Sequence, residues 1–290
     1  MRIGAIFPQT EIGNDPGEIR EYGVEVEKLG YRHILVFDHV IGANLAHRPD
    51  WKGPYNLETS FHEPFVLFGF LAGVTKTVEL TTGIIILPQR QTVLAAKQAA
   101  ALDVLSGGRF RFGIGLGWNQ VEYESLNEDF TNRGSRSVEQ IELMRKLWTD
   151  KSVEFKGRWH SVPDAGLKPL PVQQPIPVWM GGGNSERALK RIARISDGWM
   201  TTGGLTDEGQ AAIERFRGYL SEYGRDDGSV GLEGWVKLNP DDLSASGAQV
   251  EQWRDLGATH VSINTMGLDR VGGPAHLELL RAFAGEVSLG

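Results

Sequence analysis

The sequence predicts a (β/α)8 TIM barrel that forms a single domain, residues 1–290, with loop insertions at the C-terminal face. Three observations favour this fold. Eight short β-type runs alternate with eight longer helical patterns almost to the end of the chain. They cover about the 250 residues that are typical of such barrels. Several of the β-type runs are almost wholly apolar, as expected of parallel strands that are covered on both faces. A doubly wound open sheet is the alternative, because two elements after residue 225 are weak.

The individual elements follow from hydrophobic period and from turn residues. Strands are expected where short apolar runs end in turn signals, at residues 3–7, 33–37, 79–86, 110–115, 177–180, 198–201, 234–238 and 260–264. Helices are expected at residues 16–29, 63–75, 93–105, 135–148, 184–195, 207–223, 245–256 and 273–283. The stretches 40–62 and 150–174 exceed normal loop length, and such loops are commonly functional lids or added substructure.

Composition excludes several classes of function. The net charge is −7 and acidic and basic residues are interspersed along the chain, so a basic surface that binds nucleic acid is not expected. The chain contains no cysteine, which excludes disulfides, thiolate metal sites and cysteine nucleophiles. His47, His62 and His160 have no partners at metal-ligand spacing, so no metal site is predicted. No signal peptide and no apolar run of roughly 18 residues is recognisable, so we expect a cytoplasmic protein without a membrane span.

The predicted barrel selects candidate site residues by topology. Active sites of such barrels lie at the C-terminal ends of the strands and in the loops that follow them. Most of the conspicuous polar and glycine clusters of the chain fall at these positions, which are Pro8, Gln9, Asp38, His39, residues 84–88, 115–119, 181–185 and 201–204, Lys237 and Asn264.

Three consecutive glycines break an apolar run just before a helical pattern. Gly181, Gly182 and Gly183 are followed by Asn184 and Ser185, either of which can cap the helix. Glycines allow close approach of the backbone to a ligand, and the free N–H groups of a helix start favour an anion. The segment therefore predicts a phosphate site, although a plain turn between strand and helix gives the same pattern.

Asp38 and His39 follow the second predicted strand. An imidazole in this position could hydrogen-bond a cofactor or move a proton, because histidine titrates near neutrality. The structural alternative is that Asp38 caps a turn and His39 packs.

Glycines also occur within or just after the third and fourth predicted strands. Gly113, Gly115 and Gly117 allow a flat ligand close to the backbone or, equally, tight packing of strands. Gly83 indicates a bulge or a ligand lying against the strand. In the first long loop, aromatic residues could close over a planar ligand or form a small satellite core; they are Trp51, Tyr55, Phe61 and His62.

Taken together, four segments resemble the bacterial-luciferase-like superfamily of flavin and deazaflavin oxidoreductases. The segments are GAIFPQ, VFDHV, the run from ELTTGIIILPQ to GIGLGWNQVEYESL, and PIPVWMGGGNSERALKRIARISDGWM. They cover roughly residues 1–200 with high specificity. The GxGWN segment, with Glu122 and Tyr123, and the helix RSVEQIELMRKLW are most similar to the actinobacterial subgroup that uses coenzyme F420, an 8-hydroxy-5-deazaflavin.

The resemblance implies a TIM barrel that pairs as a homodimer through its early helices and holds its cofactor at the C-terminal mouth. Gly181, Gly182, Gly183 and Asn184, with Ser185, would hold the cofactor phosphate. Gly83–Ile84 would form a non-prolyl cis peptide that supports the ring, and His39 would contact the reactive region of the ring. The remaining candidates for cofactor contact are Asp38, Gly115, Gly117, Trp118 and Asn119.

At one position this sequence departs from a branch of the family that it resembles, and this departure limits the choice of substrate. Trp118 stands where the sugar-phosphate dehydrogenase branch carries a catalytic glutamate, which argues against sugar-phosphate oxidation.

Three functions are compatible with this sequence. The first is an oxidoreductase that transfers a hydride between F420 and a small, partly apolar organic substrate, with His39 as proton donor or acceptor. The second is an FMN-dependent monooxygenase that uses reduced flavin, O2 and a partner reductase. The third is a non-catalytic flavin- or deazaflavin-binding protein. Neither the substrate nor the direction of hydride transfer follows from the residues.

Overall fold

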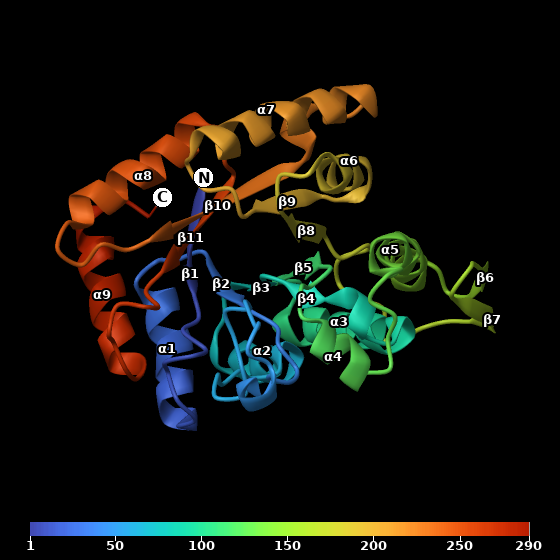
Figure 1. The fold of residues 1–290 in the computed structure, drawn as a ribbon, viewed down its shortest axis with the longest axis horizontal. Coiled ribbons are helices and arrows are strands. Elements are labelled where there is room, and N and C mark those ends of the chain that lie inside the picture. The colour runs from blue at the N-terminus through green and yellow to red at the C-terminus, as the bar shows by residue number, and fades with distance from the viewer. Residues whose placement is uncertain (290) are drawn as a thin grey trace.

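Parallel strands close into a barrel with helices around it in the computed structural model, which describes residues 1–289 (Figure 1). Neighbouring strands follow the order β3-β2-β1-β11-β10-β9-β8-β5, and β3 also pairs with β5, which closes the ring. The closed ring confirms the predicted barrel and excludes the open sheet. Its strands are β1 (Arg2–Ile6), β2 (His33–Val36), β3 (Glu79–Thr82), β4 (Ile85–Ile86), β5 (Phe110–Gly115), β8 (Val178–Gly182), β9 (Gly198–Thr201), β10 (Gly231–Lys237) and β11 (His260–Asn264).

Helices connect the strands and cover the outside of the barrel (Figure 1). Several begin at a residue that caps the free amides of the first turn; the Asp15 side chain, for example, accepts from Gly17 N and Glu18 N at the start of α1. The helices are α1 (Pro16–Lys28), α2 (Pro64–Val74), α3 (Thr92–Ser106), α4 (Gln120–Ser125), α5 (Arg133–Thr149), α6 (Glu186–Ile195), α7 (Asp207–Glu222), α8 (Leu243–Asp255) and α9 (Gly273–Glu286).

Three differences from the predicted elements lie near the candidate site. The expected strand 79–86 is interrupted at Gly83–Ile84, so that β3 and β4 share one position in the barrel. Strand β8 extends through Gly181 and Gly182, so only the third glycine of the run lies in a loop. Helix α4 was not anticipated, because a helix of six residues carries too little periodicity to be recognised.

The two long loops have different structures. Residues 40–62 contain only the short 3-10 turn η1 (Leu45–His47) and lie beside the end of β2. Residues 150–174 form an antiparallel hairpin of β6 (Val153–Lys156) and β7 (Ser161–Ala165), which lies beyond α5 in Figure 1. Its tip is held by Glu139 of α5, whose carboxylate accepts from the backbone amides of residues 158–160. The second loop is therefore added substructure on the outside of the barrel.

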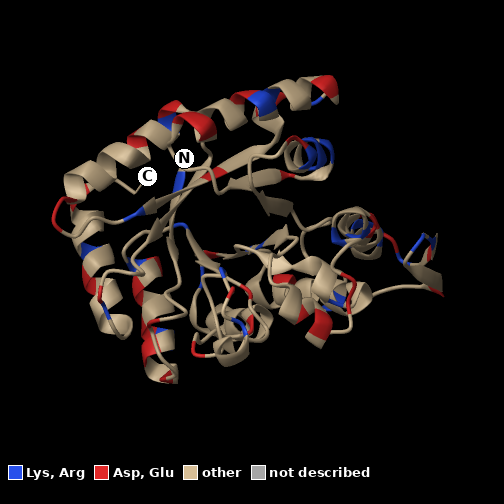
Figure 2. Ribbon diagram, in the orientation of Figure 1, with Lys and Arg blue, Asp and Glu red and all other residues tan. Residues whose placement is uncertain are grey.

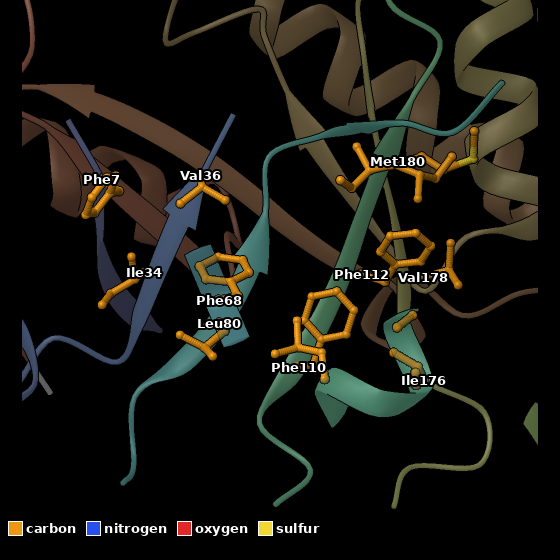
Figure 3. Close-up of a cluster of buried hydrophobic side chains, with 14 of the residues drawn as sticks. Phe7, Ile34, Val36, Phe68, Leu80, Phe110, Phe112, Ile176, Val178 and Met180 are labelled. Carbon is orange, nitrogen blue, oxygen red and sulfur yellow. The ribbon is translucent and has the colours of Figure 1, made fainter. Parts of the chain in front are cut away.

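The main hydrophobic core lies between the strands and the helices. Alternate strand residues point outward into it, including Ile34, Val36, Phe110 and Phe112, and they meet helix residues such as Phe68 (Figure 3). A second, smaller cluster of buried residues consists of Ile6, Leu35, Trp179 and Met200. These residues alternate with the outward-facing ones along their strands, so they fill the inside of the barrel.

Charged groups fill the N-terminal end of the barrel. Arg111 Nη1 lies 2.5 Å from Glu233 Oε2, and the hydroxyl of Ser262 donates to Glu233 Oε1 at 2.6 Å. His33 Nε2 lies 3.1 Å from the same carboxylate. Burial opposes ionisation of Glu233, but the positive charge of Arg111 outweighs it and holds the pKa of this carboxyl below its usual range. This end is a closed ionic layer, typical of a stabilising rather than a catalytic face.

Within residues 1–289, no helix is both long and apolar enough to cross a membrane. The same part of the chain contains no group of three or more His, Asp or Glu side chains arranged to hold a metal ion.

Candidate active site

The candidate site is built around His39, which follows β2 at the C-terminal mouth of the barrel. Its Nδ1 lies 2.8 Å from Oε1 of Glu122, a carboxylate with no solvent exposure on helix α4. The same carboxylate accepts from Val40 N at 3.2 Å and from Gln89 Nε2 at 3.1 Å. An ionised carboxylate has only acceptor sites, so the nitrogen of His39 that faces it would carry the hydrogen. In the neutral ring, Nε2 then keeps its lone pair and can accept a proton.

Aromatic side chains surround the imidazole. The ring centroids of Tyr55, Phe61 and Trp118 lie 4.8, 4.9 and 5.8 Å from that of His39. Trp51 in turn packs against Trp118 at 5.5 Å. The first long loop therefore packs against the loop after β5, and both meet at His39; that this loop acts as a lid stays a prediction. A cavity of 90 Å³ beside the ring is lined by residues that include Tyr55, Phe61 and Asn119.

Four partly buried apolar residues form the floor of the mouth. Phe37, Ile84, Trp235 and Met266 pack on the interior cluster of the barrel, and the rings of Phe37 and Trp235 lie 5.5 Å apart. Each comes from the C-terminal end of a different strand or from the residues just after it. A flat ring system would find apolar surface here, with the imidazole at its side.

Ile84 owes its position to two glycines on neighbouring strands. A Cβ atom on Gly115 would lie 2.7 Å from the Ile84 side chain, and one on Gly181 would lie 2.6 Å from it. Both glycines therefore make room for Ile84, which is a structural reason for the absence of a side chain at these positions. Their contact with the cofactor stays a prediction. The peptide bond Gly83–Ile84 is cis, as the resemblance implied.

Asp38 supports the same segment. Its Oδ2 accepts from Ile86 N at 2.9 Å and its Oδ1 from Arg90 Nη2 at 2.8 Å, with the side chain only 1% exposed. Burial raises the pKa of Asp38 although Arg90 opposes the shift. Both oxygens are thus engaged within the protein, and Asp38 supports the segment 84–86. A contact of Asp38 with the cofactor stays a prediction.

The loop after β5 brings Gly117, Trp118 and Asn119 to the mouth. Gly117 has φ +65, a left-handed conformation that favours glycine, and it lies against Ile86. Trp118 is 40% exposed and packs over Gly53 of the first loop. Asn119 accepts from Val121 N and so caps α4, which carries Glu122. Trp118 therefore faces the mouth, whereas Gly117 and Asn119 shape the backbone that presents it.

The glycine run ends in an open helix start. A Cβ on Gly183 would have no neighbour nearer than 3.8 Å, in contrast to the crowded Gly181. Ser185 occupies the cap position of α6, but its side chain makes no capping hydrogen bond, unlike the prediction. The first amides of α6 are therefore available to a ligand, next to the exposed Arg187. Asn184 lies in the same loop, and its carbonyl oxygen accepts from Arg215 Nη2 at 3.3 Å.

These residues fit a cofactor that joins a flat ring to a phosphate. The apolar floor would take the ring, and Gly183, Ser185 and the first amides of α6 would hold the phosphate. His39 lies two residues after Phe37 of this floor.

The other predicted positions either support the residues of the candidate site or lie away from it. Gln9 links the floor to the lid, because its Oε1 accepts from Phe37 N at 2.6 Å and its Nε2 donates to His62 O at 3.1 Å. Lys237 donates to Gly267 O instead of pointing to the cavity beside His39. The residue that sequence reasoning did not assign is Glu122. Its only signal in the sequence was its position three residues after the GxGWN segment, because its partner His39 lies 83 positions away.

Comparisons with known proteins agree with this fold. Residues 2–269 match the model of a family described as luciferase-like monooxygenase. An uncharacterised protein of Mycobacterium tuberculosis is 30% identical over 97% of this chain and 98% of its own length. A pyrimidine monooxygenase of Allorhizobium ampelinum is 29% identical over 76% of this chain and 62% of its own.

Solved structures share the architecture at low identity. An F420-dependent secondary alcohol dehydrogenase has a TM-score of 0.77 at 18% identity, covering 99% of this chain and 98% of its own. The monooxygenase RslO1 from Streptomyces bottropensis has a TM-score of 0.79 at 17% identity, covering 98% of each chain. At this identity the likeness establishes the fold alone.

Proposed function

The chain belongs to the luciferase-like monooxygenase family, and we propose that it is an oxidoreductase that transfers a hydride between coenzyme F420 and a small organic substrate. The observation that carries the proposal is the pair of His39 and Glu122 at the mouth of the barrel, 2.8 Å apart. The pair supplies one proton-transfer group with a defined tautomer, next to an apolar floor.

The bound deazaflavin would supply the redox chemistry by taking a hydride from a substrate carbon or returning it. Oxidation of an alcohol also releases a proton from the oxygen, and Nε2 of His39 would accept it. The buried carboxylate of Glu122 then stabilises the imidazolium that forms. In the reverse direction, the same ring returns the proton, so that one hydride and one proton move in each turnover.

The other residues position the reactants and exclude water. Phe37, Ile84, Trp235 and Met266 would support the ring, and Gly183 with Ser185 would anchor the phosphate. The aromatic lid that includes Tyr55, Phe61 and Trp118 would cover the substrate and favour a partly apolar molecule.

The preference for F420 over FMN rests on the resemblance of residues 115–119, with Glu122 and Tyr123, and of residues 136–148 to the deazaflavin subgroup. A second candidate is an FMN-dependent monooxygenase that uses O2. It is supported by the pyrimidine monooxygenase and by an FMNH2-dependent dimethylsulfone monooxygenase of Pseudomonas putida, which is 30% identical over 54% of this chain and 44% of its own. Both cofactors carry a ring and a phosphate, so the floor and the loop accommodate either.

We also propose that the protein forms a homodimer through α2 and α3. These helices pack against each other and leave large apolar side chains exposed on their outer faces. The residues are Val66 at 73%, Phe70 at 41%, Val93 at 44%, Leu94 at 53% and Leu105 at 70% exposure.

The first experiment is a parallel titration of the purified protein with oxidised F420 and with FMN, followed by cofactor fluorescence. Saturable F420 binding with much weaker FMN binding is the expected result. Selective FMN binding would replace the proposal with the monooxygenase. Stopped-flow mixing of the F420 complex with candidate alcohols then separates a catalyst from a carrier, because a carrier leaves the absorbance of the bound cofactor unchanged.

A further inference from the structure

The loop that follows strand β11 carries one residue of the floor. This β11–α9 loop, residues 265–272, contains Met266, which packs on the interior cluster of the barrel. Only its first residue, Thr265, is fully buried, and Gly267 and Gly272 have the positive φ angles of tight turns. A loop with so few buried residues is held mainly by its hydrogen bonds. The position of Met266 therefore depends on the groups that bind the loop.

Glu11, in the loop after β1, binds the β11–α9 loop near both of its ends. Strands β1 and β11 are paired, so the loops that follow them are neighbours (Figure 1). Glu11 Oε1 accepts from Gly267 N at 2.8 Å, and the backbone oxygen of Glu11 accepts from Gly272 N at 2.9 Å. The carbonyl oxygen of Gly267 is also bound, because Lys237 Nζ donates to it at 3.1 Å. Both polar backbone groups of Gly267 are therefore fixed by side chains of other elements.

The two residues before Glu11 reach the floor itself. The hydroxyl of Thr10 donates to Sδ of Met266 at 3.5 Å, and Oε1 of Gln9 accepts from Phe37 N at 2.6 Å. Phe37 and Met266 follow β2 and β11, which are the two neighbours of β1 in the barrel. The segment from Gln9 to Glu11 thus holds floor residues that come from the strands on either side of β1.

Glu11 contributes an acceptor oxygen to this contact and not an ion pair. Its second oxygen, Oε2, is buried and lies 3.4 Å from Nε2 of His276, and neither atom has a hydrogen-bond partner among residues 1–289. Burial lowers the pKa of His276 to about 4, so the imidazole carries no charge at neutral pH. A neutral side chain that keeps an acceptor at the position of Oε1 should therefore bind Gly267 as Glu11 does, whereas alanine cannot.

We propose that Glu11 is a positioning residue for the cofactor: it fastens the β11–α9 loop and so keeps Met266 in the floor on which the ring would lie. The inference rests on the proposed function, from which it takes only the position of the ring over the floor. It applies to F420 and to FMN alike, because both carry a flat ring. Loss of the acceptor at residue 11 should free the loop at Gly267, withdraw Met266 from the ring and weaken cofactor binding.

The chain offers a matched control at Glu18. Figure 2 shows acidic residues in red along α1, which packs beside α9. One of them, Glu18, accepts from Gly273 N at 2.7 Å through Oε2, so its bond is also one between a carboxylate and a glycine amide. This bond lies at the first residue of α9, beyond the β11–α9 loop. E11A and E18A each remove one such acceptor and should lower Tm by similar amounts.

The first experiment measures amide hydrogen exchange of Gly267 by NMR in the protein without cofactor. Exchange should be about ten-fold faster in E11A than in the wild type, because one hydrogen bond to a charged group is lost. It should stay within about three-fold of the wild type in E11Q, whose amide oxygen still accepts from Gly267, and in E18A. Equal rates in E11A and the wild type, or a rate in E11Q as fast as in E11A, would overturn the inference.

The second experiment titrates the same proteins with F420 and with FMN and follows cofactor fluorescence. The Kd of the cofactor that the wild type binds should rise about five-fold in E11A and stay within about two-fold in E11Q and E18A, because only E11A releases Met266. An unchanged Kd in E11A, or an equal rise in E11A and E18A, would contradict the role. Selective FMN binding with a raised Kd in E11A would refute the F420 proposal and keep the role of Glu11. If the wild type binds neither cofactor, the proposed function and this inference fail together.

Discussion

The Nδ1 atom of His39 and the Oε1 atom of Glu122 lie 2.8 Å apart and join the end of β2 to helix α4. The bond fixes the orientation of the imidazole. It also explains why a fully buried carboxylate is tolerated at the mouth of the barrel, because three donors satisfy it.

Replacing His39 should affect turnover and not cofactor binding. In H39N the proton-transfer group is lost, so we expect kcat to fall by about 10²- to 10⁴-fold while the Kd for the cofactor stays within about three-fold.

E122Q should lower kcat by about ten-fold with little change in KM, because an amide cannot stabilise the imidazolium as a carboxylate does. Steady-state kinetics with the identified substrate measures both, and E122D should recover part of the loss. Comparable kcat values for H39N and wild type would remove the catalytic role.

Gly181 and Gly183, at the two ends of the glycine run, should respond differently to substitution by alanine. In G181A the new Cβ would collide with Ile84, and we expect the free energy of unfolding to fall by about 1–3 kcal/mol. In G183A there is space, so the change should stay within about 0.5 kcal/mol. Urea denaturation measures both. Cofactor affinity should nevertheless fall about ten-fold in G183A, because the methyl group would occupy the place of the phosphate. An unchanged Kd in G183A would show that the phosphate lies elsewhere.

The crowding at Gly181 can be tested by a second substitution. Shortening Ile84 in the double variant G181A/I84A removes the atoms that collide, so part of the lost stability should return. Strictly additive losses would mean that the Ile84 contact is not the cause.

Stability should depend on pH through His276. Burial lowers the pKa of His276 from its ordinary 6.5 to about 4, against the opposing effect of its hydrogen bond with Thr265. The unfolded chain therefore binds a proton before the folded one does. The stability that this group contributes is complete above pH 6.5 and is lost as the pH falls toward 4, at a slope of up to about 1.4 kcal/mol per pH unit.

The measurement is the free energy of unfolding at several pH values from 7 to 5, for the wild type and for H276Q. The slope should be shallower in H276Q by up to the contribution of one proton. Burial also lowers the pKa of His260, to about 2, so a residual slope of the same sign should remain. Identical slopes in the two proteins would contradict the assignment to His276.

The proposed dimer should dissociate when charge is placed on the outer face of α2 and α3. V66K introduces a lysine at a position that is 73% exposed in the isolated chain, and sedimentation velocity should then report a monomer. V271K is the control, because Val271 is 84% exposed but lies in the loop before α9. A dimer that persists in V66K would place the interface elsewhere.

Much of the fold could be predicted from the sequence, because parallel strands buried on both faces give continuous apolar runs such as that of β2. His39 and the glycine run could be found because strand ends converge at one face of a barrel. The roles of Asp38 and Gly115 could not, since a buried carboxylate that holds Arg90 and a glycine that admits Ile84 look the same in sequence as ligand contacts. Glu122 was missed because its partner is distant along the chain.

The floor of the mouth has a consequence for the synthesis of the protein. Phe37 and Ile84 come from the first third of the chain, whereas Trp235 and Met266 come from its end, and β1 pairs with β11 to bring these parts together. A nascent chain that still lacks β10 and β11 therefore has the glycine loop but only two of the four floor residues. Under the proposed function, cofactor capture should begin only when the C-terminal segment leaves the ribosome.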